Sequence, residues 1–162
     1  MKTLNLVDLE KSDIKYKISQ FPDGQQDVVL IGLNSENPCV EQVLNPTKIK
    51  SRFNSFKDLE LIVCTVKALR RLGVKEIHLY IPYLLGARSD RQFVEGGNSY
   101  LVDVIAPDIN ALNFESVTVM DVHSDVAAAC IKNLKVIGNV ELVNFALYDI
   151  FYKTEGLLEG GI

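Results

Sequence analysis

The sequence predicts an α/β protein in which a parallel β-sheet carries helices on both faces. The main observation is an alternation: from residue 47 to 138, short apolar runs typical of strands take turns with longer segments of helical periodicity. Such an alternation favours parallel strands joined by crossover helices. The second observation is size, because 162 residues, 48% of them apolar, are enough for one domain with its own core.

The composition and charge of the sequence indicate which kinds of partner and which cellular compartment to expect. The net charge is -4 and no run of 18 apolar residues occurs, so neither nucleic-acid binding nor a membrane span is favoured. Residues 1–13 contain early acidic residues and no long apolar core, unlike a signal peptide. Cys39, Cys64 and Cys130 are too widely spaced for a disulfide framework or a zinc site, and are expected to be buried thiols in a reducing compartment. We therefore expect a cytoplasmic protein with no nucleic-acid or membrane partner.

The first fifty residues are expected to form short strands. Residues 15–19 alternate weakly between polar and apolar, and residues 27–32 (DVVLIG) form a stronger strand pattern. Between them, FPDG at 21–24 predicts a turn, because proline presets one backbone dihedral and glycine permits the next. Residues 47–53 alternate in the manner of a half-buried strand.

Residues 56–72 are expected to form the longest helix. Six apolar residues recur on one face at 3.6-residue spacing: Phe56, Leu59, Ile62, Val63, Val66 and Leu69. Ser55 and Asp58 predict a capping box at the start, and basic residues followed by Gly73 predict the end.

The second half continues the alternation. The expected elements are strand 76–81, helix 99–112, strand 116–121, helix 124–134 and strand 135–138. Pro107 predicts a break or kink inside helix 99–112. Since ligands bind beyond the carboxyl ends of parallel strands, the segments after residues 81 and 121 are the places to look for a site.

The segment after the first of these strands, IPYLLGARSDRQF at 81–93, is unusually charged for a strand end. Arg88 offers a planar cation that can pair with phosphate or stack on a base. Asp90 could accept a hydrogen bond from a ligand, or could hold Arg88 or Arg91. The alternative interpretation is a solvated loop with internal ion pairs.

The segment after the second strand, MDVHSD at 120–125, holds Asp121 and His123. If the strand persists, the two side chains point the same way and could hold a metal ion or a nucleotide phosphate. A helix that begins near Ser124 would also direct its N-terminal amides at an anion there. The alternative is that the aspartate caps the next helix.

The turn FPDGQQ places Phe21 beside Asp23 and Gln25. An exposed phenylalanine at a turn tip can be a stacking platform, and its polar neighbours can bond to the edge of a base. The alternative is a phenylalanine that covers the core in an ordinary turn.

Together these segments resemble the ribose-phosphate pyrophosphokinase family, also called phosphoribosyl pyrophosphate synthetase. The family pattern N-S-F-N-D-L…A-L-R-R…I-P-Y-x-x-x-A-R-Q-D-R-K resembles residues 54–92, the pattern F-x-D-G-E resembles FPDGQ at 21–25, and M-D-L-H resembles MDVH at 120–123. The matching segments run in the same order from about residue 20 to 140.

The resemblance implies a phosphoribosyltransferase-like fold and a reaction. Enzymes of the family have two similar α/β domains and transfer the β,γ-diphosphoryl group of ATP to ribose 5-phosphate. The products are phosphoribosyl pyrophosphate and AMP, and Mg²⁺ is required. The family forms homo-oligomers, so we expect the same here.

The resemblance also implies the residues of an ATP site. Adenine is sandwiched between Phe21 of a neighbouring subunit and Arg88. Asp23 and Gln25 correspond to the residues that contact the adenine amino group, and Ser89 corresponds to a family glutamine that reaches ATP.

The same resemblance extends the site to the phosphates. Asp90 belongs to the ATP-binding turn, and Arg88 and His123 correspond to catalytic positions. His123 and Asp121 are the candidate ligands for Mg²⁺. A histidine as the sole protein ligand of Mg²⁺ would be unusual, so contact with phosphate or with metal-bound water is an equal alternative for His123.

The resemblance implies half of an enzyme. Residues 1–150 correspond to the N-terminal, ATP-side domain and residues 151–162 to a linker or tail. The acidic D-D-x-x-x-T-G-G-T loop of the second, ribose 5-phosphate domain does not occur, so the chain alone is not expected to be active. The alternative is a non-catalytic, synthetase-associated regulatory or assembly subunit, which Gln25 and Ser89, in place of the family's glutamate and glutamine, favour. A third reading, a free-standing phosphoribosyltransferase-like domain, is disfavoured by the absent acidic loop.

Overall fold

A five-stranded parallel sheet forms the centre of the computed structural model, which describes residues 1–33, 44–122 and 124–158. The strands lie in the order β1-β4-β5-β6-β7, so their order in the sheet follows their order in the chain. Their bounds are β1 Lys2–Asn5, β4 Thr47–Lys50, β5 Ile77–Tyr80, β6 Ser116–Met120 and β7 Leu134–Ile137. The predicted α/β class with a parallel sheet is confirmed.

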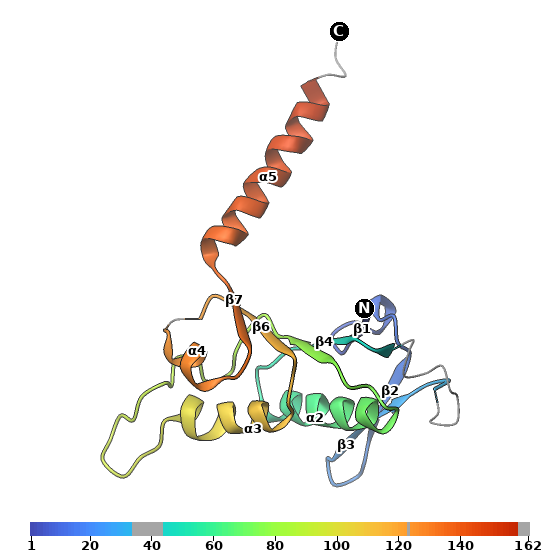
Figure 1. The fold of residues 1–162 in the computed structure, drawn as a ribbon, viewed down its shortest axis with the longest axis vertical. Coiled ribbons are helices and arrows are strands. Elements are labelled where there is room, and N and C mark those ends of the chain that lie inside the picture. Colours follow the sequence, from blue (N-terminus) through green and yellow to red (C-terminus); the bar gives the residue numbers. More distant parts are fainter. Residues whose placement is uncertain (34–43, 123, 159–162) are drawn as a thin grey trace.

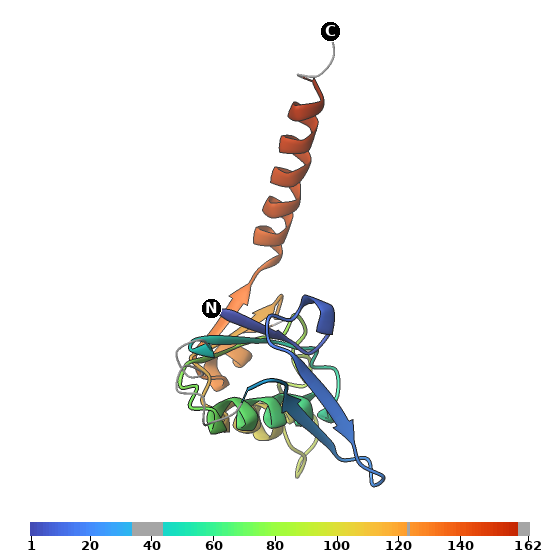
Figure 2. The ribbon, with the colours of Figure 1, turned by 90° about the vertical axis from the view of Figure 1, so that its right-hand side faces the viewer.

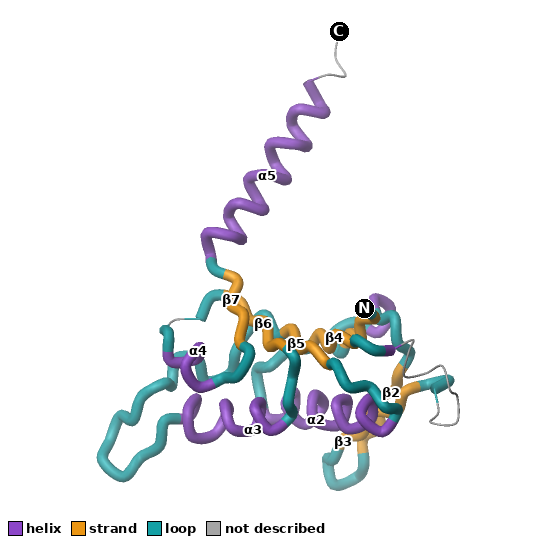
Figure 3. Tube along the Cα trace, viewed as in Figure 1, coloured by secondary structure: helices purple, strands orange, loops and turns teal. Residues whose placement is uncertain are grey.

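Helices α2 Phe56–Arg71, α3 Ala106–Ala111 and α4 Val126–Cys130 lie in the connections from β4 to β5, from β5 to β6 and from β6 to β7. Figures 1 and 3 show α2 and α3 on the same side of the sheet. Right-handed crossovers between strands that follow one another in order place successive helices on the same face. The sheet is thus flanked by helices as expected, and among the described residues α2 and α3 share one of its faces.

The core lies between the sheet and these helices. Alternate strand residues are less than 2% exposed on this side: Leu4, Ile49, Ile77, Leu79, Val117 and Val119. They meet equally buried residues of the helical layer: Ile62, Leu69, Leu101 and Ile105. The alternation arises because successive strand residues point to opposite faces.

The register places a second set of strand residues on the other side, which we call the open sheet face. It consists of Thr3, Asn5, Lys48, Lys50, His78, Tyr80, Ser116, Thr118, Met120, Lys135 and Ile137. Most of these side chains are polar and half-buried. Parallel sheets are usually covered on both faces by apolar layers, so this composition is unusual.

The predicted longest helix and its capping box are confirmed. Ser55 and Asp58 exchange hydrogen bonds at the start of α2, where the Ser55 backbone N–H donates to the carboxylate over 3.0 Å. At the other end, the Arg70 guanidinium donates to the carbonyls of Val74 and Asn113, each over 3.0 Å. A cation at this position also suits the negative end of the helix dipole.

The predicted break in the helix at residues 99–112 is also confirmed. A π-helical segment, η2 Tyr100–Ile105, precedes α3, and Pro107 lies in the first turn of α3. Proline has no backbone N–H to donate, so regular α-helical bonding is interrupted where it enters the helix. Asp103 stabilises the start of η2 by accepting a hydrogen bond from the Ser99 backbone N–H over 2.7 Å.

The N-terminal segment adds a short 3₁₀ helix, η1 Leu9–Lys11, and an antiparallel hairpin of β2 Tyr16–Gln20 and β3 Gln26–Leu30. The predicted turn joins the two strands at residues 21–25. The hairpin packs against α2 and buries Val28 and Leu30. The hydroxyl of Tyr16 donates to the Asn5 carbonyl over 2.6 Å and ties the hairpin to β1.

The C-terminal helix α5, Asn139–Leu158, was not predicted. It follows β7 after the single residue Gly138 and projects away from the body (Figures 1 and 2). The expected boundary after residue 150 is not marked by a change in secondary structure, since α5 continues through it. None of the helices in the described parts of the chain is both long and apolar enough to cross a lipid bilayer.

The buried sheet residues should dominate stability. Leu79→Ala is expected to lower the free energy of unfolding by about 2–5 kcal/mol, because it leaves a cavity between the sheet and the helices. Urea denaturation followed by circular dichroism measures this loss. The control Val29→Ala, at a side chain 41% exposed, should cost less than about 1 kcal/mol. Equal losses for both variants would contradict the assigned core.

Candidate functional site

The loops that follow β5 and β6 meet at the carboxyl ends of these strands. The Ser124 hydroxyl donates to the Asp90 carboxylate over 2.5 Å, which joins residues 34 positions apart. A second bond joins the same loops, from the Met120 backbone N–H to the Pro82 carbonyl over 3.3 Å. Short hydrogen bonds to a carboxylate are among the stronger ones, so the first contact fixes the position of Asp90.

The charged turn after β5 is held by its backbone and by Asp90. Ser89 donates its backbone N–H to Gly86 over 2.8 Å and accepts from the Leu101 backbone N–H over 3.0 Å. Arg91 forms a loose ion pair with Asp90, with 3.8 Å between Nε and Oδ1. The Asp90 side chain is 12% exposed whereas that of Arg91 is 81% exposed. Asp90 is thus mainly a structural anchor of the turn, and Arg88 lies exposed beside it.

The turn after β5 packs closely against η2, where Gly86 approaches the ring of Tyr100. Gly86 has a φ of +81°, and a Cβ atom there would lie 2.8 Å from Cδ1 of Tyr100. Only glycine satisfies both the left-handed backbone and this distance. The Tyr100 ring in turn meets the Phe56 ring edge-on, with 6.1 Å between centroids, at the start of α2.

At the end of β6 the structure departs from the geometry expected for Asp121. The strand ends at Met120, and Asp121 has a φ of +45° while its N–H donates to the Ile137 carbonyl over 2.9 Å. The premise that a continued strand aligns its side chain with that of His123 therefore does not hold. His123 itself lies outside the described residues, and among the described ones no group of three His, Cys, Asp or Glu side chains is arranged to hold a metal ion.

The tip of the β2–β3 hairpin exposes Phe21. Its side chain is 49% exposed, so it does not cover the core. The tip is closed by a bond from the Phe21 N–H to the Gln25 carbonyl over 2.9 Å, and the Asp23 carboxylate accepts from the Gln25 N–H over 3.2 Å. Gly24, with a φ of +88°, supplies the left-handed residue that the turn needs.

One chain does not bring the two halves of the predicted ATP site together. In Figure 1 the tip of the β2–β3 hairpin and the loop after β5 lie apart, on opposite sides of the view. A site that uses both Phe21 and Arg88 therefore requires two chains. The contact between Asp90 and Ser124 and this separation were not foreseeable from residue spacing.

The His78 side chain, in the middle of β5, is held by two neighbouring side chains. Its Nδ1 lies 2.8 Å from the Ser116 hydroxyl oxygen, and its Nε2 lies 3.2 Å from a carboxylate oxygen of Glu76. Both ring nitrogens are therefore satisfied by neighbouring side chains, which leaves little scope for binding a ligand.

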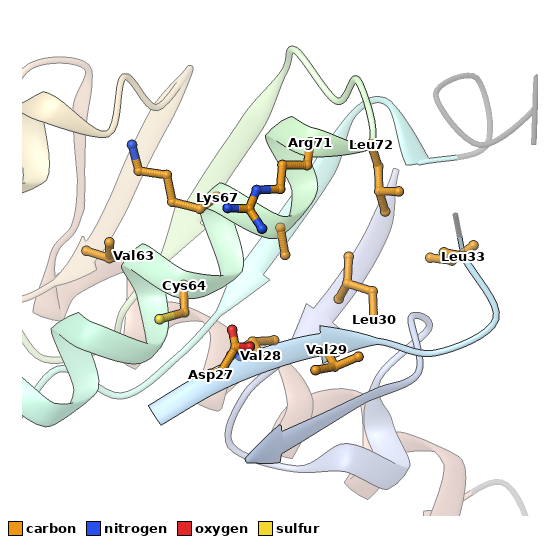
Figure 4. Close-up of a pocket in the computed structure, with 11 residues that line it drawn as sticks. Asp27, Val28, Val29, Leu30, Leu33, Val63, Cys64, Lys67, Arg71 and Leu72 are labelled. Carbon is orange, nitrogen blue, oxygen red and sulfur yellow. Dashed lines mark hydrogen bonds between the residues drawn. The ribbon is translucent and has the colours of Figure 1, made fainter. Parts of the chain in front are cut away.

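A groove between β3 and α2 was not predicted (Figure 4). Its volume is about 490 Å³, and its walls are mostly apolar side chains, with Lys67 and Arg71 among the lining residues. The groove combines residues from two elements, so no single stretch of sequence signals it. The lining includes one thiol, that of Cys64, which donates to the Gln26 carbonyl over 3.4 Å.

The two described cysteines are half-buried and free. Burial raises the pKa of the Cys64 thiol, and the carboxylates of Asp27 and Glu60 raise it further. Burial also raises the pKa of Cys130. Since the thiolate is the reactive species, these positions suit unreactive thiols. The sequence predicted buried thiols, and the two described ones are half-buried.

Comparison with known proteins supports the fold. No family model and no curated protein matches the sequence. Among solved structures, the chain is similar to the crystal structure of phosphoribosylpyrophosphate synthetase from Mycobacterium smegmatis, with a TM-score of 0.68 and 14% sequence identity. The similarity covers 87% of this chain and 45% of that one, so the chain spans less than half of that protein. At this identity the likeness shows the fold alone, which is that of a phosphoribosylpyrophosphate synthetase.

The raised pKa of Cys64 predicts slow alkylation. In a Cys39→Ser, Cys130→Ser background, the rate of reaction with iodoacetamide should rise with pH about a midpoint above the value of about 8.5 for an unstructured cysteine. Asp27→Asn removes one negative charge and should lower that midpoint. A midpoint at or below that of an unstructured cysteine peptide would contradict the assigned environment.

Proposed function

We propose that this chain is the ATP-side half of a ribose-phosphate diphosphokinase. The complete reaction converts ATP and ribose 5-phosphate into phosphoribosyl pyrophosphate and AMP. The observation that carries the proposal is agreement between two independent features. The chain is similar in fold to 45% of a phosphoribosylpyrophosphate synthetase chain. The described segments that resemble this family include the hairpin tip, α2 with β5, and the turn after β5.

Adenine binding would use two copies of the chain in a homo-oligomer. Phe21 is exposed at the hairpin tip of one copy, and Arg88 is exposed beside the anchored turn of another. A planar base fits between an aromatic ring and a guanidinium, because both stack on a π-face. Asp23 and Gln25 at the same tip offer oxygen atoms that can accept from the amino group of adenine.

The phosphates would lie where the turn after β5 meets the loop after β6. Phosphoryl transfer depends mainly on positioning and on neutralising charge, and the guanidinium of Arg88 supplies a permanent positive charge. Ser89 and Asp90 hold the turn in place through their bonds to Gly86 and Ser124. In the sequence His123 lies between β6 and α4, and it is the candidate contact with the transferred group.

Mg²⁺ would bind at this site together with the nucleotide, whose phosphates would supply some of its oxygen ligands. Magnesium prefers oxygen ligands and is usually held by one or two carboxylates together with phosphates and water. Asp121 is an exposed carboxylate beside the end of β6, and His123 is the second candidate ligand. When bound, the ion would neutralise phosphate charge during transfer.

The second substrate requires the other half of such an enzyme. The acidic loop that would bind ribose 5-phosphate does not occur in the sequence, so this chain would act together with a second domain. The half-buried, unpaired thiols suit a reducing compartment such as the cytoplasm.

A second candidate is a non-catalytic subunit that assembles with an active synthetase. It is favoured by Ser89, whose side chain is short and whose backbone N–H and C=O are both used within the chain. Gln25 favours it too, because an amide lacks the charge of a carboxylate. Stable assembly with a complete synthetase, without nucleotide binding, would support this candidate over the first.

Calorimetric titration with Mg²⁺ and a non-hydrolysable ATP analogue tests the nucleotide site. Phe21→Ala should cost about 1–3 kcal/mol of binding, whereas Phe21→Tyr keeps the ring and should retain most affinity. Arg88→Ala should abolish measurable binding. The control Arg71→Ala removes an exposed arginine from α2 and should leave the affinity for the ATP analogue unchanged. Full affinity in both Phe21→Ala and Arg88→Ala would exclude this site.

The chain alone is expected to form no phosphoribosyl pyrophosphate, because the ribose 5-phosphate site is missing. Incubation with Mg²⁺, ATP and ribose 5-phosphate, followed by chromatography of AMP, measures the reaction. A complete synthetase serves as the positive control. Stoichiometric AMP and phosphoribosyl pyrophosphate from the purified chain would contradict the assignment of half an enzyme.

A further inference from the structure

A depression of about 390 Å³ lies on the open sheet face, at the carboxyl ends of β1, β4 and β5. The register pairs Asn5 with Lys50 and Lys50 with Tyr80, which are the last residues of these three strands. Ligands of parallel sheets bind at the carboxyl ends of the strands, and this volume is enough for a small ligand. The other residues of the lining are Thr3, Lys11, Asp13 and Lys48.

Asn5 presents a hydrogen-bond donor to this depression. Its side-chain oxygen accepts from the backbone N–H groups of Val7 and Asp8, over 3.1 and 3.2 Å. These two bonds identify the oxygen, so the amide nitrogen Nδ2 is the atom left to face the depression. Asn5 is only 3% exposed, and its Nδ2 has no hydrogen-bond partner among the described residues. Because buried polar groups are normally hydrogen-bonded, the depression should contain an acceptor for this donor.

Lys48 and Lys50 place two positive charges beside this donor. They are two residues apart on β4, so both point to the open sheet face. Both are half-buried, and neither forms an ion pair with an acidic residue in the described part of the chain. The Lys50 ammonium lies 6.0 Å from the centre of the Tyr80 ring, a favourable but modest contact. Since neighbouring like charges repel, this arrangement favours an anion that binds both ammonium groups.

The acidic residues in and around the depression have other partners. The Asp13 carboxylate, in the lining, accepts from a backbone N–H of β1 over 2.8 Å. Outside the lining, Asp8 pairs with Lys11 over 3.1 Å, and the Glu76 carboxylate lies 3.2 Å from Nε2 of His78. The lining itself contains three lysines and one aspartate, a net charge of +2. Positive charge therefore remains after the acid of the lining is counted.

We propose that this depression binds the phosphate group of a small molecule. Lys48, Lys50 and Nδ2 of Asn5 donate to the phosphate oxygens, and lysine ammonium groups are common phosphate ligands. At neutral pH a phosphate group carries nearly two negative charges, which match the two lysines. The ligand is inorganic phosphate or a small phosphate monoester. The site is separate from the proposed ATP site, because it uses neither Phe21 nor Arg88.

Calorimetric titration of the full chain with inorganic phosphate, and separately with glycerol 3-phosphate, tests the proposal at constant ionic strength. At least one of the two should bind, and the tighter one identifies the source of the phosphate group. The variant Asn5→Asp keeps the oxygen that accepts from Val7 and Asp8 but replaces the Nδ2 donor by a negatively charged oxygen. It should weaken binding about tenfold or more, because it removes a donor and adds a like charge.

Two further variants change the charge of the lining in opposite directions. Lys48→Met, Lys50→Met removes both cations and should abolish measurable binding. Asp13→Asn removes the negative charge and keeps an oxygen for the N–H of β1, so it should strengthen binding, by about threefold. The matched control Lys57→Met, Lys67→Met removes two exposed lysines from α2 and should leave the affinity unchanged.

Thermal unfolding followed by circular dichroism confirms that each variant is folded. Absence of binding by both compounds overturns the proposal. Binding that survives both Asn5→Asp and the Lys48→Met, Lys50→Met double variant also overturns it. Binding that is lost in Arg88→Ala but kept in Asn5→Asp overturns it too, because the phosphate would then lie in the nucleotide site.

Discussion

The order of the strands is the constraint on which the rest of this structure depends. Because the parallel strands follow one another across the sheet, right-handed crossovers bring α2 and α3 to the same side. That side becomes the apolar core, and the carboxyl ends of β5 and β6 are left adjacent, where Asp90 and Ser124 meet. In the described part of the chain, the same constraint places α2 and α3 on the side away from the polar residues of the sheet. The core and the candidate site thus both follow from the order of the strands.

Sequence reasoning succeeded where a local pattern has a single physical meaning. The 3.6-residue period and the capping box located α2, and Pro107 located the break before α3. It failed for α5, whose apolar residues surround the helix and give no clear period. It also extended the strand to Asp121, because no residue type in that stretch reveals that the backbone turns to a φ of +45° there. Backbone conformation at a strand end is set by tertiary contacts, here with the Ile137 carbonyl.

The sequence predicted which segments make up the candidate site, but not how these segments are arranged in space. Residue chemistry and the carboxyl-end rule identified the turn around Arg88, and turn chemistry identified the hairpin tip with Phe21. The spacing of residues in the sequence could not show that the Asp90 carboxylate accepts a hydrogen bond from the Ser124 hydroxyl. It also could not show that the hairpin tip and the turn after β5 lie apart within one chain. The motifs that resemble the synthetase family are short, and the overall identity to the similar solved structure is 14%. The agreement between motif and fold is therefore stronger than either alone.

The contact between Gly86 and Tyr100 limits where the loop after β5 can vary in evolution. The first part of the loop cannot change its path or length, because the ring of Tyr100 fills the space beside Gly86. That ring also contacts the ring of Phe56. Beyond Asp90, residues 91–98 are all exposed. Insertions and deletions among related chains should therefore accumulate in that outer part, while the length from Pro82 to Ser89 stays constant. Such a chain could lengthen its loop toward new ligands without moving the anchored turn.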